Sequence, residues 1–252
     1  MERKAGNGEW IYGRRPVAEV FAAARRHIHE LVLAEEGRET PELATLRAAA
    51  TRAGAAVRRV NRRELDDLTL NGNHQGVAVR TGGFPYVCVE EVAGWVEKRK
   101  DALVLILDHL EDPQNLGSLL RTADAAGVLA VVIPEDRAVG VTPAAVRASA
   151  GASEHVRVAR VVNLVRAMEQ LKKAGLWTVG LDMEGPDVRP HTAIDFRDRI
   201  GIVVGSEGHG LKRLTREACD FIARLPMGGQ VASLNAAVAG AVCLYEAVRQ
   251  RQ

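Results

Sequence analysis

The chain has 252 residues, which at about 150 residues per domain is enough for two compact domains or one large domain. Hydrophobic residues make up 47% of the chain and charged residues 26%, a globular composition that excludes wholesale disorder. The 34 basic and 32 acidic residues leave a formal charge of +2, which excludes a uniformly basic protein but not a local basic face.

The first 80 residues predict a small α/β unit, because short apolar runs alternate between helical and strand periodicity. The predicted elements are a helix over Val17–Ala24 behind Pro16, a strand at Leu31–Leu33, a helix over Pro41–Ala53, a strand at Ala55–Val60, a helix near Arg63–Leu68 and a strand at Gly76–Val79. A unit of this size is too small for an enzyme of a familiar type and suits a binding module.

Basic residues of this unit are concentrated in one stretch. Between Leu43 and Arg63 the sequence holds no acidic residue but six arginines, namely Arg47, Arg52, Arg58, Arg59, Arg62 and Arg63. Arginine binds phosphate bidentately and is common at nucleic-acid backbones. The stretch therefore favours nucleic-acid binding, and the alternative is a solvated helix face followed by a turn.

Two glycines and a proline in Thr81–Pro85 predict a linker, placed at residues 81–100, between a domain at 1–80 and a second domain at 101–252. Strands are predicted at Ala102–Leu107, Ala130–Ile133, Trp177–Leu181, Ile200–Val204 and Phe221–Leu225, and helices at 115–126, 142–150, 163–174 and 233–250. Continuous Val, Ile and Leu runs are typical of strands covered on both faces. The second domain is therefore predicted as α/β with a largely parallel sheet, whose ligand sites lie at the carboxyl ends of the strands.

Three loops that follow predicted strands carry polar or glycine-rich patterns. In the first, Asp112–Gly127, Asn115 is placed to cap a helix, and Gly117 and Arg121 lie four apart on one helical face. A cation beside a residue without a side chain leaves room for a phosphate or a ribose. The alternative is a capped helix with an ordinary surface arginine.

The second loop, Gly205–Gly210, holds three glycines that let a ligand approach the backbone. Its outer glycines have phosphate-loop spacing, but Leu211 and Lys212 stand where that motif needs Lys followed by Ser or Thr. A ligand other than a nucleoside triphosphate, or a plain tight turn, remains.

The third loop, Pro226–Asn235, precedes the last predicted helix, which either Ser233 or Asn235 caps. An apolar stripe follows at helical spacing, formed by Leu234, Ala237, Val238, Ala241, Leu244, Tyr245 and Val248. This stripe predicts a core or a subunit interface. The small residues Ala236, Ala239 and Gly240 allow another helix to pack closely.

Together the three loops resemble motifs 1, 2 and 3 of the SpoU/TrmH branch of the SPOUT RNA ribose 2'-O-methyltransferases. The shared residues are Asn115, Gly117, Arg121 and Gly127, then Gly205, Glu207 and Gly210, then Pro226, Met227, Ser233, Leu234 and Asn235. The match spans residues 101–252, and the segment from Tyr12 to about Arg80 is similar to the small ribosomal-protein-like substrate-binding domain of many members. The overall arrangement is most similar to the RlmB-like group, which methylates a guanosine ribose in 23S rRNA.

The resemblance implies a C-terminal trefoil knot, a homodimer formed through the knot and the C-terminal helix region, active sites built across that interface, and S-adenosylmethionine as cofactor, without a metal. It assigns cofactor binding to Gly205, Gly210, Leu225, Met227 and Leu234. It assigns the target nucleotide to Arg121, and the rest of the polar catalytic site to Asn115, Glu207, Ser233 and Asn235.

The predicted function is therefore 2'-O-methylation of a guanosine in 23S rRNA. Two alternatives stay open: the same reaction on tRNA or another rRNA site, and a non-catalytic RNA-binding factor of ribosome assembly. Aromatic residues make up only 4% of the chain, which favours RNA recognition by shape and backbone over base stacking. No DNA partner is expected.

The cysteines Cys88, Cys219 and Cys243 are far apart and odd in number, so neither a disulfide framework nor a zinc knuckle is predicted. The first residues lack the apolar stretch of a signal peptide, and no run approaches the roughly 20 apolar residues of a membrane span. We expect a soluble cytoplasmic protein with no membrane contact.

Overall fold

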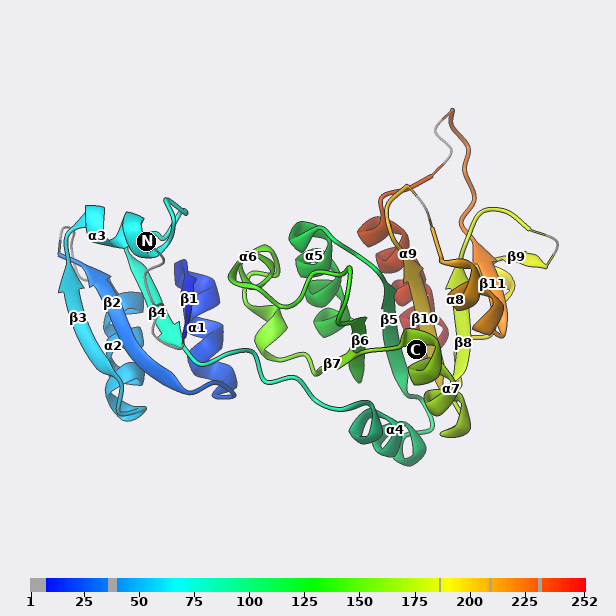
Figure 1. The fold of residues 1–252 in the computed structure, drawn as a ribbon, viewed down its shortest axis with the longest axis horizontal. Helices are drawn as coiled ribbons and strands as arrows, with labels where there is room; N and C mark the ends of the chain where they lie inside the picture. The colour runs from blue at the N-terminus through cyan, green and yellow to red at the C-terminus, as the bar shows by residue number, and fades with distance from the viewer. Residues whose placement is uncertain (1–7, 36–39, 186, 209, 231–232) are drawn as a thin grey trace. The chain divides into compact units, whose positions relative to one another are not determined.

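The computed structural model describes residues 8–35, 40–185, 187–208, 210–230 and 233–252 (Figure 1). Their contacts form two compact units. The first unit groups the chain up to Pro85 with Val141–His155, and the second groups Tyr86–Gly140 with Val156–Gln252. The segment Val141–His155 thus packs with the first unit, although the chain places it between two strands of the second.

The first unit is a four-stranded sheet with helices. Its elements are β1 (Glu9–Tyr12), α1 (Arg14–Ala23), β2 (Ile28–Ala34), α2 (Pro41–Arg52), β3 (Ala56–Val60), α3 (Arg62–Leu68) and β4 (Val77–Thr81), joined by α6 (Pro143–Ala148) and the 3₁₀ turn η1 (Ala152–Glu154). The strand order is β1-β4-β2-β3, and only β2 and β3 run parallel. All six predicted elements are present. Strand β1 was not predicted, because a run of four residues with one buried side chain, Ile11, has too little periodicity.

The arginine-rich stretch lies on α2, β3 and the start of α3, and all six arginines are exposed. The stretch itself contains no acidic residue, but residues around it supply two. Arg58 on β3 forms ion pairs with Glu30 on β2 at 2.9 Å and with Glu64 on α3 at 3.0 Å. Part of the positive charge is therefore neutralised by a residue of the neighbouring strand β2 and by the first acidic residue after the stretch.

The second unit is a seven-stranded sheet of order β7-β6-β5-β10-β8-β11-β9, in which every pair is parallel. Its strands are β5 (Leu103–Asp108), β6 (Ala130–Pro134), β7 (Val158–Val161), β8 (Trp177–Leu181), β9 (Val188–Pro190), β10 (Ile200–Gly205) and β11 (Phe221–Arg224). Its helices are α4 (Val89–Lys98), α5 (Pro113–Ala125), α7 (Leu164–Lys173), α8 (Arg213–Ala218) and α9 (Ala236–Gln250), with the 3₁₀ turn η2 (His191–Ala193). The predicted α/β class with a parallel sheet is confirmed.

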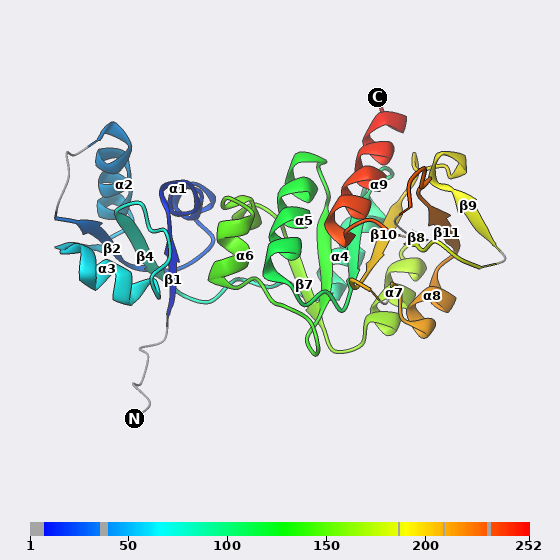
Figure 2. The ribbon, with the colours of Figure 1, turned by 90° about the horizontal axis from the view of Figure 1, so that it is seen from above.

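Helices cover both faces of this sheet (Figure 2). Helices α5 and α9 lie together on one face, and α7 and α8 lie together on the other, with α4 packed on α7. The central strands β5 and β10 are buried along their whole length. The continuous apolar runs seen in the sequence are explained by this double cover.

Helix α9 packs closely because of one glycine. A Cβ added at Gly240 would lie 2.7 Å from Leu119 of α5 and 3.2 Å from Val204 of β10. On the same helix burial raises the pKa of the Cys243 thiol to about 12, so this cysteine stays protonated and belongs to the core. The predicted close packing of a second helix at this position is confirmed, and the second helix is α5.

The apolar stripe that begins at Leu234 and continues along α9 divides into two faces. Ala237 and Leu244 are buried in the unit. Leu234 (42%), just before α9, and Val238 (49%) and Tyr245 (53%) on α9 are exposed, as is Val242 (39%), which was not part of the predicted stripe. We call these four residues the α9 stripe.

Within the part of the chain that the structure describes, no helix is both long and apolar enough to cross a membrane. The same residues contain no group of three or more His, Cys, Asp or Glu side chains arranged to hold a metal ion.

Candidate active site

A pocket of about 310 Å³ lies where β8, β10 and β11 end and α9 begins. All five residues predicted to bind the cofactor line it, together with two of the predicted polar residues: Gly205, Gly210, Leu225, Met227, Leu234, Glu207 and Ser233. The volume is at the lower end of the range of small-molecule sites. Residues from the second and third sequence loops thus meet at the carboxyl edge of the parallel sheet, where the fold class predicts a ligand.

The glycine loop after β10 is closed by its own backbone. Ser206 and Gly210 exchange two N–H to carbonyl hydrogen bonds of 3.1 Å each. A Cβ at Gly205 would lie 2.5 Å from the Leu211 nitrogen and would overlap the backbone of Gly210. Gly208 and Gly210 have φ values of +77° and +62°, a region that favours glycine. The sequence therefore needs glycine at these positions to form a loop this tight; His209 lies outside the described residues.

Three predicted polar residues meet beside the pocket. The Asn235 amide donates to Asn115 Oδ1 at 3.0 Å and to Glu207 Oε1 at 2.6 Å, and the Asn115 amide also donates to Glu207 Oε1. These residues come from α5, from the glycine loop and from the start of α9, so all three sequence motifs contribute. We call Asn115, Glu207 and Asn235 the polar triad.

The structure shows which residues cap the two helices. Asn235 caps α9, because its side-chain oxygen accepts from the N–H groups of Ala237 at 2.9 Å and Val238 at 3.2 Å. The prediction that Asn115 caps a helix is wrong. Helix α5 begins at Pro113, and Asp112 caps it by accepting from the Gln114 N–H at 2.9 Å. Proline suits the first position of a helix, so α5 begins earlier and leaves the Asn115 side chain free to join the triad.

Asp108 was not singled out in the sequence, but it anchors the backbone just after the glycine loop through a hydrogen bond. This fully buried carboxylate ends β5 and accepts from the Lys212 N–H at 2.7 Å, just after the loop. His109 Nδ1 lies 2.5 Å from its other oxygen. The pattern that points to it is an acid ending a wholly apolar strand, because such a group needs polar partners once buried.

The pocket is acidic. Its described lining includes the carboxylates of Asp182, Glu184 and Glu207 but no lysine or arginine. Asp182 is paired with Arg216 at 3.0 Å, which leaves two further carboxylates at the rim. The remaining lining is mainly apolar or glycine, so the pocket suits a small ligand with an apolar part and a positive charge. The segment Leu181–Glu184 was not predicted, because it carries no glycine pattern.

Arg121 does not line the pocket of its own chain. It is exposed on α5, whereas Gly117 and the triad residue Asn115 on the same helix are buried. The described residues thus bring together nine of the ten residues singled out in the sequence, in the pocket or in the adjoining triad. The role of Arg121 stays a prediction.

Comparison with known proteins matches both parts of the chain to family models. Residues 102–245 match the SpoU rRNA Methylase family, and residues 10–87 match the family described as RNA 2'-O ribose methyltransferase substrate binding. Among curated proteins, a 23S rRNA (guanosine-2'-O-)-methyltransferase RlmB from Xanthomonas campestris pv. campestris is 43% identical over 96% of this chain and 97% of its own length. One of the same name from Coxiella burnetii is 42% identical over 96% of each chain.

Solved structures agree with these matches. The SpoU methyltransferase AviRb from Streptomyces viridochromogenes, crystallised in complex with the cofactor AdoMet, has a TM-score of 0.81 and 25% identity, covering 97% of this chain and 91% of its own. An AdoMet-bound rRNA methyltransferase from Sinorhizobium meliloti has the same fold, with a TM-score of 0.83 and 24% identity over 98% of this chain and 88% of its own. The chain belongs to the SpoU methylase family.

Proposed function

We propose that this protein transfers the methyl group of S-adenosylmethionine to the ribose 2'-oxygen of a guanosine in 23S rRNA. The observation that carries the proposal is the convergence of three separate sequence loops on one pocket and its adjoining polar triad. The curated relatives with this named activity match nearly the whole chain, including the substrate-binding part. An rRNA substrate also implies a cytoplasmic protein.

The pocket fits S-adenosylmethionine by the chemistry of its lining. The apolar side chains of Leu225, Met227 and Leu234 suit the adenine ring, and the tight glycine loop leaves backbone groups open to the ligand. The rim carboxylates suit a cationic sulfonium. When bound, S-adenosylmethionine supplies an activated methyl group, so the protein's own residues have only to place a ribose oxygen and handle one proton.

The polar triad is the part of the chain that orients the reacting groups. Its amides tie Glu207 to α5 and α9, so the carboxylate is held in one position at the pocket rim. Arg121 acts by binding the target phosphate and stabilising negative charge rather than as a base. Glu207 or a phosphate of the substrate accepts the 2'-hydroxyl proton.

We propose a homodimer in which the α9 stripe is covered by a second copy of the chain. Four large apolar side chains, three exposed on α9 and one just before it, are costly to leave in water. The stripe adjoins the pocket, since Leu234 belongs to both. Sedimentation equilibrium should give twice the 27.2 kDa chain mass, and a monomer at micromolar concentration would contradict the dimer. We further propose that the domain boundary lies within residues 81–100 and that the C-terminal region around α9 forms a knot.

Radiolabelled methyl transfer tests the function. We expect incorporation into 23S rRNA isolated from cells that lack this protein, at one ribose-methylated guanosine that nuclease mapping locates. Incorporation into tRNA or another rRNA alone would move the substrate and keep the chemistry. If no RNA is labelled and calorimetry detects no binding of S-adenosylmethionine, the protein is instead a non-catalytic RNA-binding factor.

The polar triad makes a separable prediction for Asn235→Asp. Aspartate caps a helix as well as asparagine, so α9 should remain intact. The new carboxylate would lie 2.6 Å from the Glu207 oxygen, and repulsion between two carboxylates raises the pKa of the pair. We expect methyl transfer at pH 8 to fall by about tenfold or more and to recover in part as the pH is lowered towards 6.

The matched control for this prediction is Asn163→Asp. Asn163 caps α7 by accepting from the Arg166 N–H at 3.0 Å, and it has no part in the triad. Its pH profile of methyl transfer should match that of the wild type. Equal profiles for Asn235→Asp and the wild type would show that the triad does no more than cap α9.

A further inference from the structure

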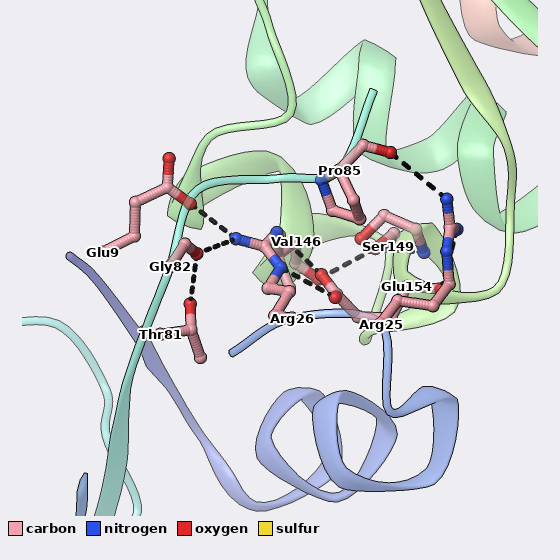
Figure 3. A network of polar contacts seen from close by, with 10 residues as sticks. Glu9, Arg25, Arg26, Thr81, Gly82, Pro85, Val146, Ser149 and Glu154 are labelled. Atoms are coloured by element: carbon pink, nitrogen blue, oxygen red, sulfur yellow. Dashed lines mark hydrogen bonds and ion pairs between the residues drawn. The ribbon is translucent and has the colours of Figure 1, made fainter. Parts of the chain in front are cut away.

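The segment Val141–His155 is joined to the first unit by a buried ion pair (Figure 3). Arg26, in the loop between α1 and β2, binds Glu154 of η1 through two hydrogen bonds of 2.8 Å each. The side chains of Arg26 and Glu154 are 0% and 1% exposed. Burial alone would lower the pKa of Arg26, but the carboxylates of Glu154 and Glu9 raise it by more. The pKa is therefore raised overall and the guanidinium stays charged. A two-bond buried pair of this kind fixes one position for η1.

Further contacts along helix α1 support the same placement. The Arg25 guanidinium donates to the Glu154 carbonyl at 3.1 Å, and the His155 ring lies 2.7 Å from the Glu19 carboxylate. Gly151 has φ +90°, and a Cβ there would lie 2.7 Å from the Glu19 Cβ. The backbone of the segment therefore lies directly against α1, and the segment is held along its length and not at one point.

In this position α6 lies at the edge of a large groove of the first unit and contributes to its lining. The groove has a volume of about 1650 Å³ and is lined mainly by residues of α1, α2, α3 and the loop before β4, with Arg147 of α6 and Ala150 completing it. Five arginines line it, Arg14, Arg15, Arg59, Arg62 and Arg147, against the two carboxylates of Glu42 and Asp66. The groove is therefore basic, and only two of its arginines come from the stretch at 43–63.

The charge of Arg147 is available to a ligand. Arg14 is paired with Glu42 at 3.1 Å, whereas among the described residues Arg15, Arg62 and Arg147 have no acidic side chain within ion-pair distance. Arg147 is exposed, and its guanidinium lies 5.6 Å from the centre of the Tyr12 ring. An arginine held over an aromatic ring is ordered while its donors still face solvent, an arrangement that suits a phosphate.

We propose that Arg147 is an RNA-binding residue of the first unit, supplied by a segment that the chain inserts between β6 and β7. The inference rests on the proposed function, because an RNA backbone is what makes a basic groove of this size useful. The buried pair of Arg26 and Glu154 has the structural task of holding α6 at the groove. The RNA-binding surface is thus assembled from both sides of the boundary between the two family matches.

The test compares Arg147→Ala, Arg147→Lys and Arg166→Ala with the wild type. Arg166 is an exposed arginine of α7 in the second unit, so its loss changes net charge equally without touching the groove. Fluorescence anisotropy measures binding to an unmodified 23S rRNA transcript at several salt concentrations from about 50 to about 200 mM, which gives the salt dependence of the affinity. Calorimetry measures S-adenosylmethionine binding, and methyl transfer gives KM for RNA and kcat.

We expect Arg147→Ala to weaken RNA binding about fivefold and to reduce the slope of log affinity against log salt by about 1. KM for RNA should rise with kcat and cofactor binding unchanged, Arg147→Lys should restore most of the affinity, and Arg166→Ala should behave as the wild type. If the wild type binds and methylates rRNA but Arg147→Ala does so equally well, this inference fails while the proposed function stands. A wild type that neither binds nor methylates rRNA would overturn both.

Discussion

Replacing Gly205 with alanine is expected to abolish S-adenosylmethionine binding and methyl transfer. The added Cβ would overlap the backbone of Gly210 and lie 2.5 Å from the Leu211 nitrogen, and backbone atoms cannot turn away as a side chain can. The loop would have to open, and with it the Ser206–Gly210 hydrogen bonds that shape the pocket. We expect the cofactor Kd to rise by about 100-fold or more, equivalent to about 2.7 kcal/mol, in isothermal titration calorimetry.

Gly228→Ala is the control for this prediction. Gly228 belongs to the loop between β11 and α9, and a Cβ there would meet nothing within 4 Å. It should bind the cofactor as the wild type does. Circular dichroism and thermal unfolding of both variants separate a local change in the loop from loss of the fold. A folded Gly205→Ala protein with wild-type cofactor affinity would show that the glycine loop does not form the cofactor site.

The fold was largely predictable because its strongest signals are local. Buried parallel strands such as β5 and β10 are continuous apolar runs, and a helix such as α7 follows a capping residue, Asn163. The short strands β7 and β9 were missed because an arginine interrupts each short apolar run, which leaves no continuous hydrophobic signal. The packing of Val141–His155 with the first unit was not predictable, because it depends on Arg26 and Glu154, which are 128 positions apart.

The site was predictable where chemistry needs a rare local pattern. The resemblance to the SpoU/TrmH family, carried by the three motifs in their order along the chain, pointed to the residues that line the pocket and form the triad, although Glu207 and Asn115 are 92 positions apart. The cap of α5 was misplaced because an asparagine and an aspartate three residues apart both suit that role, and the position of Pro113 decides between them. Asp108 was missed because a single acid at the end of a strand is common, and only its burial shows that it supports the loop.

Arg121→Ala is expected to reduce kcat for methyl transfer by about 10²- to 10³-fold, the usual cost of removing one group that stabilises developing charge. Cofactor affinity should stay at the wild-type value, because Arg121 is assigned to the target nucleotide and is not among the cofactor-binding residues that line the pocket. Arg121→Lys keeps the charge but loses the planar pair of donors, so we expect it to recover only part of the rate. Full activity of Arg121→Ala would remove this residue from the mechanism.

Co-expression of Arg121→Ala with Gly205→Ala tests whether Arg121 acts in the pocket of the second copy. The two variants are inactive for different reasons. When equal amounts of the two chains pair at random, half of all dimers carry one chain of each kind. If Arg121 serves the partner's pocket, one of the two sites in each mixed dimer has both an intact glycine loop and an intact arginine, and about a quarter of wild-type activity returns. If Arg121 serves its own pocket, every site lacks one of the two residues and no activity returns. The exposed position of Arg121 outside its own pocket favours the first result. The second chain that covers the α9 stripe beside the pocket would then also supply the arginine that the pocket lacks.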